Sequence, residues 1–377
     1  MKTTKPSLTL GVEEEYFLVD KTSRDLAVDP PNEIFSECKN LFDHQVSHEF
    51  IRSQIEIGTK VCKNVAEVRE DLIKLRGGVA RIANQHGYAP IAASTHPFAR
   101  WQAQKHTERE RYNNLAEDMQ AVANRMLIGG MHIHFGIEDE DLRIDLMNQV
   151  LYFLPHLLAL SCSSPFWHGT NTGLQCYRLT VFNDLPRTGL PAHFDSFAEF
   201  ERNIGALVNA NIIEDATKIW WDIRPSVRYP TLELRIMDVC TNLEDALSIV
   251  ALAQSIMHML YRLRLDNKRW REYRKMLVYE NRWRAMRYGV TDNLIDFGKG
   301  TQVPYKQLLD EMIDMIKEDA VELGCLTEVM NAYRILERGT SSQQQTAVFE
   351  QCVEKGESKQ SALNSVVDWL VEETVKF

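Results

Sequence analysis

Six short segments of the chain alternate between apolar and polar residues, with every second side chain apolar. This alternation is typical of a β-strand that buries one face against a core. The segments are residues 8–20, 53–59, 131–136, 178–183, 220–225 and 232–239. Their polar positions point away from the core, so these are the positions where a site for chemistry can be built.

A helical pattern follows the second of these segments. From residue 64 to residue 87 the apolar residues recur at steps of three and four, which places them on one face of a helix. Asn64 and Glu67 form a capping box at its start, and Gly87 is a stop signal after its end. The pattern predicts an amphipathic helix.

A second helix is predicted to begin at Thr241, with Glu244 in the matching capping position. Apolar residues cover most of its circumference over residues 246–265, which indicates a core helix. After residue 300 the pattern is helical almost to the C-terminus, and it is broken at Gly324 and at the polar stretch 339–345.

Strands that alternate in face, separated by amphipathic helices, predict an α+β protein with a mainly antiparallel sheet. Helices are expected to cover one face of this sheet and to leave the other open for a ligand. No repeat, low-complexity block or linker divides the first 300 residues. We therefore expect residues 1–300 to form one domain and residues 301–377 to form a helical layer packed on the same domain.

The composition excludes several classes of protein. Of the 377 residues, 44% are hydrophobic and 25% are charged, which is typical of a globular protein and not of a disordered chain. The formal net charge of −10 argues against nucleic-acid and anionic-membrane partners. The seven cysteines form no close pair, the N-terminus lacks the apolar region of a signal peptide, and no apolar stretch is long enough for a membrane span. A cytoplasmic protein is expected.

Acidic residues occupy the polar positions of the first segment. In GVEEEYFLVD, residues 11–20, Glu13 and Glu15 share one face of the strand about 7 Å apart, whereas Glu14 projects to the other face. Two partly buried carboxylates on one face repel each other, so we expect a cation to neutralise them. A solvated acidic strand end is the alternative interpretation.

Two further strands carry polar side chains on a single face. Glu56 shares its face with Gln54, and His132 shares its face with His134. A half-exposed strand and hydrogen-bonded core histidines are the alternatives. The pattern does not favour zinc, because no third histidine or cysteine stands at the usual spacing. Carboxylates instead favour Mg²⁺ or Mn²⁺.

Both signs of charge occur in the last two strand segments. Glu233 and Arg235 share one face, opposite an apolar face, and Arg224 lies in the preceding strand segment. A site that holds both Mg²⁺ and phosphate needs both signs of charge. A surface ion pair, which stabilises little, is the alternative.

Other basic residues cluster in two places. One cluster contains Arg178 and Arg187, and the other contains Lys275, Arg282, Arg284 and Arg287. In an acidic protein this local positive charge suggests a pocket for a carboxylate or a triphosphate. A solvated basic helix face explains the second cluster almost equally well. The chain has neither a P-loop motif nor a dinucleotide-binding glycine motif, so a nucleotide site would be of another type.

Taken together, these segments resemble the bacterial carboxylate–amine ligases of the glutamate–cysteine ligase type 2 family. The matching motifs are colinear, and the region from the first to the last of them spans about three quarters of the chain. They are GVEEEYFLVD (11–20), QIEIGT (54–59), GGMHIHFG (129–136), SSPFWHGTNTG (163–173), PRTGLP (186–191), WWDIRP (220–225), PTLELRIMDVC (230–240) and ENRWRAMRYG (280–289). GMHIH and ELR also look like the metal-site strands of glutamine synthetase.

The resemblance implies a glutamine-synthetase-like catalytic domain in residues 1–300, with a curved sheet whose concave face binds ATP and Mg²⁺, or Mn²⁺ in its place. It implies that ATP phosphorylates a substrate carboxylate, classically the γ-carboxylate of glutamate. The amine of cysteine then displaces the phosphate to form an amide. Small-molecule amino acids would be the partners, as substrates, in glutathione biosynthesis.

The resemblance also implies roles for particular residues, with Arg235 near the transferred phosphoryl group. The implied metal ligands are Glu13, Glu15, Glu56, His132 and Glu233. The candidate catalytic residues are Arg235, Arg178 and Arg224, and the candidate nucleotide-binding residues are Arg282, Arg284 and Lys275.

Two other functions stay open at this point. One is a phosphotransferase that uses the same ATP site without forming an amide, and the other is a non-catalytic regulator that binds a nucleotide or an amino acid. Residues 163–173 and 183–191, rich in Gly, Ser, Pro and Asn, are candidates for a lid that excludes water. The apolar segment 151–160 and the helical tail make a homodimer plausible.

Overall fold

The computed structural model describes residues 5–377, and at its centre lies a seven-stranded antiparallel sheet. The strands are β1 (Leu10–Asp20), β2 (Val46–His48), β3 (Gln54–Gly58), β4 (Tyr88–Ile91), β5 (Met131–Gly136), β10 (Ile223–Pro225) and β11 (Thr231–Leu234). Their order is β10–β11–β5–β1–β3–β2, and β4 pairs with the second half of β1. The long strand β1 therefore contacts β3 on one edge and both β5 and β4 on the other.

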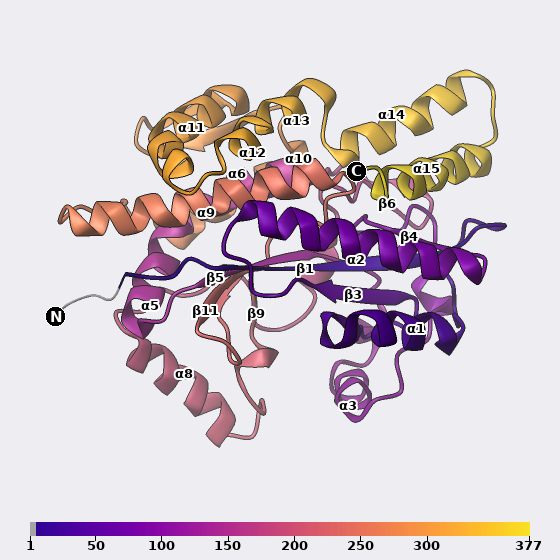
Figure 1. Cartoon of the computed structure of the whole chain (residues 1–377), viewed down its shortest axis with the longest axis horizontal. Helices are drawn as coiled ribbons and strands as arrows, with labels where there is room; N and C mark the ends of the chain where they lie inside the picture. The colour runs from indigo at the N-terminus through magenta and orange to yellow at the C-terminus, as the bar shows by residue number, and fades with distance from the viewer. Residues whose placement is uncertain (1–4) are drawn as a thin grey trace.

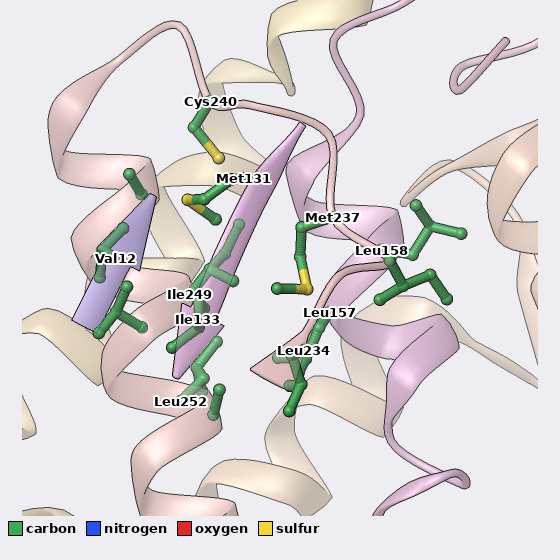
Figure 2. Close-up of a cluster of buried hydrophobic side chains, with 14 of the residues drawn as sticks. Val12, Met131, Ile133, Leu157, Leu158, Leu234, Met237, Cys240, Ile249 and Leu252 are labelled. Carbon is green, nitrogen blue, oxygen red and sulfur yellow. The ribbon is translucent and has the colours of Figure 1, made fainter. Parts of the chain in front are cut away.

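The alternation of side chains gives this sheet one apolar face and one polar face. Val12 lies opposite Ile133 on β5, and Ile133 lies opposite Leu234 on β11; all three side chains are fully buried. Figure 2 shows them in one cluster with Ile249 and Leu252 from the core helix behind the sheet. On each strand the residues next to these three in sequence project to the opposite face, and most of them are polar.

Helices cover the apolar face of the sheet, and α9 and α11–α15 lie on that side in Figure 1. Helices α3 and α8 lie on the other side of the sheet in the same view. The helices are α1 (Asn32–Phe42), α2 (Val65–Gln85), α3 (Glu110–Met119), α4 (Ala121–Asn124), α5 (Glu140–Val150), α6 (Leu154–Ser161), α7 (Arg178–Phe182), α8 (Phe197–Asn209), α9 (Leu243–Leu265), α10 (Lys275–Tyr288), α11 (Tyr305–Glu322), α12 (Leu326–Met330), α13 (Ala332–Arg338), α14 (Ser341–Glu354) and α15 (Lys359–Thr374). The expected α+β fold is confirmed.

Three short pairs of strands and three single turns of 3₁₀-helix complete the structure. The strand pairs are β6 (Phe166–Trp167) with β7 (Thr170–Asn171), β8 (Thr188–Gly189) with β9 (Trp220–Trp221), and β12 (Asn293–Asp296) with β13 (Thr301–Pro304). The 3₁₀ turns are η1 (Asp43–Gln45), η2 (Trp101–Ala103) and η3 (Ala216–Lys218). None of these six strands joins the central sheet.

The two helices that the sequence predicts both form. In α2 the Asn64 side chain accepts a hydrogen bond from the backbone N–H of Glu67, and Gly87 follows the helix with a φ of 82°. In α9 the capping residue is Asn242 and not Thr241, because the Thr241 hydroxyl instead donates to the carbonyl of Ala92. The predicted helix start was therefore wrong by one residue.

Helix α9 is long and apolar enough to cross a membrane by length and composition alone. However, 89% of its apolar window is buried inside the protein, as in a core helix. Helix α6, which contains much of the apolar segment 151–160, is also entirely buried. These residues pack inside the chain and leave no apolar face on α6 for a second copy.

Three of the predicted strands differ from the structure. Residues 178–183 form the short helix α7, because Leu179 and Phe182 are three apart and reach the core from one side of a helical turn. The segment 220–225 divides at Asp222 between β9 and β10, since Asp222 turns its carboxylate toward Arg282. The strand predicted for 232–239 ends at Leu234.

The tail after residue 300 is helical, as predicted, and its first helix α11 packs along α9. The expected break at 339–345 is much shorter, because Thr340 and Gln343 form a capping box that starts α14 directly at Ser341. The hairpin β12–β13 was not predicted and spans residue 300. The division into a domain and a helical layer at this residue stays a prediction.

Candidate active site

Strand register brings carboxylates and imidazoles together on the polar face of the sheet. On β1, Glu13 lies opposite His132 of β5, and Glu15 lies opposite Glu56 of β3. The next row along β5 holds His134. Side chains from three strands therefore converge on one surface, as their alternation in sequence predicts.

The same surface continues onto β11 and β10. Glu233 lies opposite His134, and Arg224 lies opposite Glu233. Arg235, two residues after Glu233, pairs with the Glu233 carboxylate through Nη1, and its Nη1 also lies 3.5 Å from His132 Nδ1.

The third glutamate of the triplet, Glu14, has a different role. It projects to the other face of the sheet, where its Oε1 lies 2.6 Å from Nη2 of Arg76 and both side chains are fully buried. The division of the triplet between two faces is as predicted, and Glu14 belongs to the core.

A cavity of about 970 Å³ opens over the polar face. Most of the predicted site residues line it, from five different strands, from helix α7 and, for Arg235, from the residue directly after β11. They are Glu13, Glu15, Glu56, His132, Glu233, Arg178, Arg224 and Arg235.

Glu13, His134 and Glu233 form a group that can hold a divalent cation. One ligand atom of each lies within 4.8 Å of the others. His134 Nε2 is buried and has no hydrogen-bond partner, although it lies 3.4 Å from Glu13 Oε1, while its Nδ1 lies 3.0 Å from Thr231 Oγ1. A buried nitrogen without a partner beside two carboxylates fits a bound cation, and the contact with Thr231 would orient the ring as outer partners of metal ligands do.

The sequence identified both imidazoles and assigned His132 to the metal, whereas the spacing of ligand atoms selects His134 for this group. His132 Nδ1 lies 3.2 Å from Glu13 Oε2, and its Nε2 lies 3.9 Å from Glu15 Oε1. Burial, together with the charge of Arg235, lowers the pKa of His132 to about 4. His132 therefore stands as a neutral neighbour that links Glu13, Glu15 and Arg235.

The carboxylates of Glu13 and Glu233 are held in the charged form. Burial alone would raise the pKa of Glu13, but the two neighbouring imidazoles of His132 and His134 outweigh burial and hold it well below its usual value. Burial is likewise outweighed at Glu233, whose pKa is lowered by Arg235 and Arg224.

A second group of carboxylates lies further along the cavity. Burial and the charge of Glu49 raise the pKa of Glu15 to about 8, and burial with a hydrogen bond to Glu49 raises the pKa of Glu56 well above its usual value. Glu15 Oε2 also accepts a hydrogen bond of 2.7 Å from the backbone N–H of Gly130. Carboxylates with raised pKa values placed this closely favour a positively charged ligand or metal ion, which would let them ionise.

The other two arginines predicted for the site, Arg178 and Arg224, differ in their surroundings. Arg224 is held by Glu233 at 3.1 Å and donates to three backbone carbonyls, among them Ile219 at 2.7 Å. Arg178 is 3% exposed, and among residues 5–377 no carboxylate pairs with it within 4.0 Å. Arg224 is thus anchored by a carboxylate, whereas Arg178 has no direct carboxylate partner and acts on Glu15 and Asp238 only at longer range.

The three residues expected to bind the nucleotide do not line the cavity. Arg282 is buried in an ion pair with Asp222, with Nε 2.7 Å from Oδ2. Arg284 donates to a backbone carbonyl, and the ammonium of Lys275 lies over the ring of Tyr279. These cations stabilise helix α10 and its neighbours, so a direct role at the nucleotide does not fit their positions.

Several residues of the cavity were not identified from the sequence. They are the acidic Glu49, the aromatic Tyr112 and the basic Arg109, Arg111, Lys218 and Arg228. They lie in loops, in α3 and in the 3₁₀ turn η3, where no alternation marks a face, so only local charge was available as a signal. The two predicted lid loops contribute nothing to the lining, and residues 44–50 and 226–231 form part of the rim instead.

Comparison with known proteins identifies the family of this chain. The family model of glutamate-cysteine ligase family 2 matches residues 9–367. A curated protein of Rhodospirillum rubrum, named "Putative glutamate--cysteine ligase 2", is 54% identical over 98% of this chain and 96% of its own length. One of the same name from Jannaschia sp. is 53% identical over 97% and 96%.

A solved structure shares the fold. The glutamate–cysteine ligase of Francisella tularensis in complex with AMP superimposes with a TM-score of 0.71, covering 100% of this chain and 91% of that chain, at 14% sequence identity. Fold and relatives together define a carboxylate–amine ligase of the glutamate–cysteine ligase type. The chain belongs to glutamate–cysteine ligase family 2, and the resemblance seen in its motifs is confirmed.

Proposed function

We propose that this protein joins a carboxylate to an amine at the expense of ATP, through an acyl-phosphate intermediate. The proposed reaction is L-glutamate + L-cysteine + ATP to γ-glutamylcysteine + ADP + phosphate, with Mg²⁺ as the metal ion. The family and the names of the relatives support the substrates, and the site supports the chemistry.

The observation that carries the proposal is the pairing of a metal-binding group with an arginine on one wall of the cavity. Glu13, His134 and Glu233 would hold Mg²⁺, with Glu15 and Glu56 as further candidate ligands. Bound there, Mg²⁺ would neutralise phosphate charge and orient the triphosphate.

In the first step an oxygen of the substrate carboxylate attacks the γ-phosphorus of ATP and ADP leaves. Negative charge then spreads over the equatorial oxygens of the transferred group. Arg235, which is buried beside Glu233 and His132, is placed to stabilise that charge. The basic residues Arg109, Arg111 and Arg228 on the cavity lining attract the anionic reactants.

In the second step the amine attacks the acyl carbon, phosphate leaves, and the nitrogen loses a proton. An acyl phosphate is hydrolysed by water, so the cavity must admit the amine and exclude water while the intermediate exists. Tyr112 and Leu115 from α3 line the cavity and are suited to limit access to it.

The proposal is tested by following ADP release with Mg²⁺ and a panel of acids and amines. Release that requires both glutamate and cysteine, with γ-glutamylcysteine as the product, is the expected result. A phosphorylated acid that accumulates without an amine would identify a phosphotransferase instead. Binding of nucleotide with no turnover across the whole panel would contradict the ligase and favour a regulator.

A further inference from the structure

Arg178 is a buried cation without a partner for its Nε. Its Nη1 and Nη2 donate to the backbone carbonyls of Ile236 and Arg235 at 3.3 Å and 3.2 Å, which fixes the plane of the guanidinium. Its Nε is buried and makes no hydrogen bond. Arg178 also lines the cavity, so its unpartnered Nε–H is a candidate donor to an oxyanion bound there.

Gly130 occupies the space beside this guanidinium. A Cβ atom at residue 130 would lie 2.8 Å from Arg178 Cζ and closer still to Nη2, so any larger residue would displace the arginine. The φ of Gly130 is not positive, so its backbone does not itself require glycine. The absence of a side chain here is explained by the arginine.

Gly130 also fixes a second group of the site. Its N–H donates to the Glu15 carboxylate at 2.7 Å, and its carbonyl accepts from the Glu15 N–H at 3.1 Å. It lies directly before β5 and two residues before His132, which corresponds to a displacement of about 7 Å along the sheet from the row of Glu13 and His132.

We propose that Gly130 is a positioning residue whose missing side chain lets Arg178 bind an oxyanion of a reactant, one row along the sheet from the metal group. This inference rests on the proposed function, because the oxyanion belongs to one of the proposed reactants. It is either a carboxylate of the acid that does not react or a phosphate of the nucleotide.

The test compares Gly130→Ala, Arg178→Met and the double variant with the unaltered protein. Each single change is expected to lower kcat/KM about 10- to 100-fold, because a charge-assisted hydrogen bond is lost. The double variant is expected to be no worse than Arg178→Met within about twofold, since without the guanidinium the added methyl group displaces nothing. Effects that multiply in the double variant would overturn the positioning role.

Direct binding identifies the oxyanion. Calorimetric titrations with Mg²⁺–ATP and, separately, with L-glutamate are made on each variant. Weakened binding of L-glutamate alone assigns a carboxylate, and weakened binding of Mg²⁺–ATP alone assigns a phosphate; either supports the inference. Unchanged affinity for both ligands would overturn it.

Two further variants keep the test independent of folding and of the proposed function. Arg178→Lys retains the charge without the planar guanidinium and cannot clash with Gly130, so it tests the oxyanion role even if Gly130→Ala does not fold. Gly205→Ala in α8 adds a Cβ that meets nothing within 4 Å and is expected to leave activity unchanged. If the unaltered protein joins no acid to an amine but Arg178→Met still loses ligand affinity, the proposed function fails and this inference stands. If the protein is an active ligase and neither Arg178→Met nor Arg178→Lys changes its activity, this inference alone is contradicted.

Discussion

At the scale of single residues, one strand serves two purposes because its side chains alternate. Glu13 and Glu15 face the cavity, and Glu14 faces the core, where Arg76 neutralises it. Three consecutive identical residues thus differ in their surroundings and in the effect that a substitution should have. Under the proposed function, a substitution of Glu13 or Glu15 should affect the reaction, and a substitution of Glu14 should affect folding.

The first prediction at this scale concerns the candidate metal ligands Glu13 and Glu233. Glu13→Gln and Glu233→Gln each remove a charged ligand but keep the shape of the side chain. We expect each change to lower kcat/KM by about 100-fold or more, because charge stabilisation at the phosphates is lost. Steady-state ADP release measures the effect, and the thermal unfolding midpoint should show that the fold persists.

Glu201→Gln is the matched control, since Glu201 is exposed on α8 and remote from the sheet register that builds the site. It should retain full activity. Full activity in either Glu13→Gln or Glu233→Gln would remove these residues from the metal group.

At the scale of elements, helix α11 is fastened to α9 by a buried carboxylate. Asp319 on α11 lies 2.7 Å from His258 Nδ1 and 2.7 Å from Arg262 Nη2, both on α9. Burial alone would raise the pKa of Asp319, but the hydrogen bonds from Arg262 and His258 outweigh burial and lower it. The contact therefore stabilises the folded state only while Asp319 is ionised.

Asp319→Asn is expected to lower the free energy of unfolding by about 1–2 kcal/mol at pH 7, because Arg262 is partly exposed and its contribution is screened. A carboxyl whose pKa is lowered on folding contributes in full above its unfolded pKa of about 4 and loses that contribution as the pH falls through its folded pKa. The difference between the two proteins should therefore shrink below pH 4. Urea titrations between pH 7 and pH 3 measure it.

Asp314→Asn, an exposed change on the same helix, should leave stability unchanged at every pH. A difference between Asp319→Asn and the unaltered protein that is independent of pH would show that the ionised carboxylate does not stabilise this contact.

Elements also show which parts of the fold the sequence could predict. Alternation over five or more residues fixed the faces of β1, β3 and β5. The family resemblance implied that Glu13, Glu56 and His132 share one site, and the strand register does bring them together. In the short segment 178–183, the apolar spacing fits a turn of helix as well as a strand, and packing of Phe182 decided in favour of α7. Hydrophobic periodicity can distinguish a helix from a strand only over a longer segment.

The site could be predicted only where it lies on regular strands. Arg282 shows the limit, because its partner Asp222 lies 60 residues away in sequence and no local pattern reveals that pairing. Glu49 and Arg109 enter the cavity from loops, whose paths depend on the packing of the whole chain. Local charge alone could not place them.

At the scale of the whole molecule, Arg76 connects the sheet to the C-terminal region. Its guanidinium pairs with Glu14 and donates to the carbonyls of Cys240 and Thr241 at 2.9 Å and 2.8 Å, and to that of Thr374 in α15 at 3.4 Å. One buried side chain thus joins segments from the beginning, the middle and the end of the chain.

Arg76→Met is expected to lower the free energy of unfolding by about 3–5 kcal/mol, because the buried Glu14 carboxylate would lose its counter-ion. Adding Glu14→Gln to Arg76→Met should restore part of the loss, since no unpaired charge would then remain. Chemical denaturation of the three variants measures both effects. Arg81→Met, an exposed change on the same helix, should alter stability by less than about 0.5 kcal/mol, and a similar loss in Arg81→Met and Arg76→Met would contradict the connecting role.

The central claim is that the acid is activated by phosphorylation before the amide forms, and an isotope measurement tests it most directly. L-Glutamate labelled with oxygen-18 in its γ-carboxylate is turned over with ATP, Mg²⁺ and cysteine, and the phosphate released is analysed by mass spectrometry. An acyl-phosphate route transfers one labelled oxygen to phosphate for every amide formed. Amide formation with unlabelled phosphate would contradict the account.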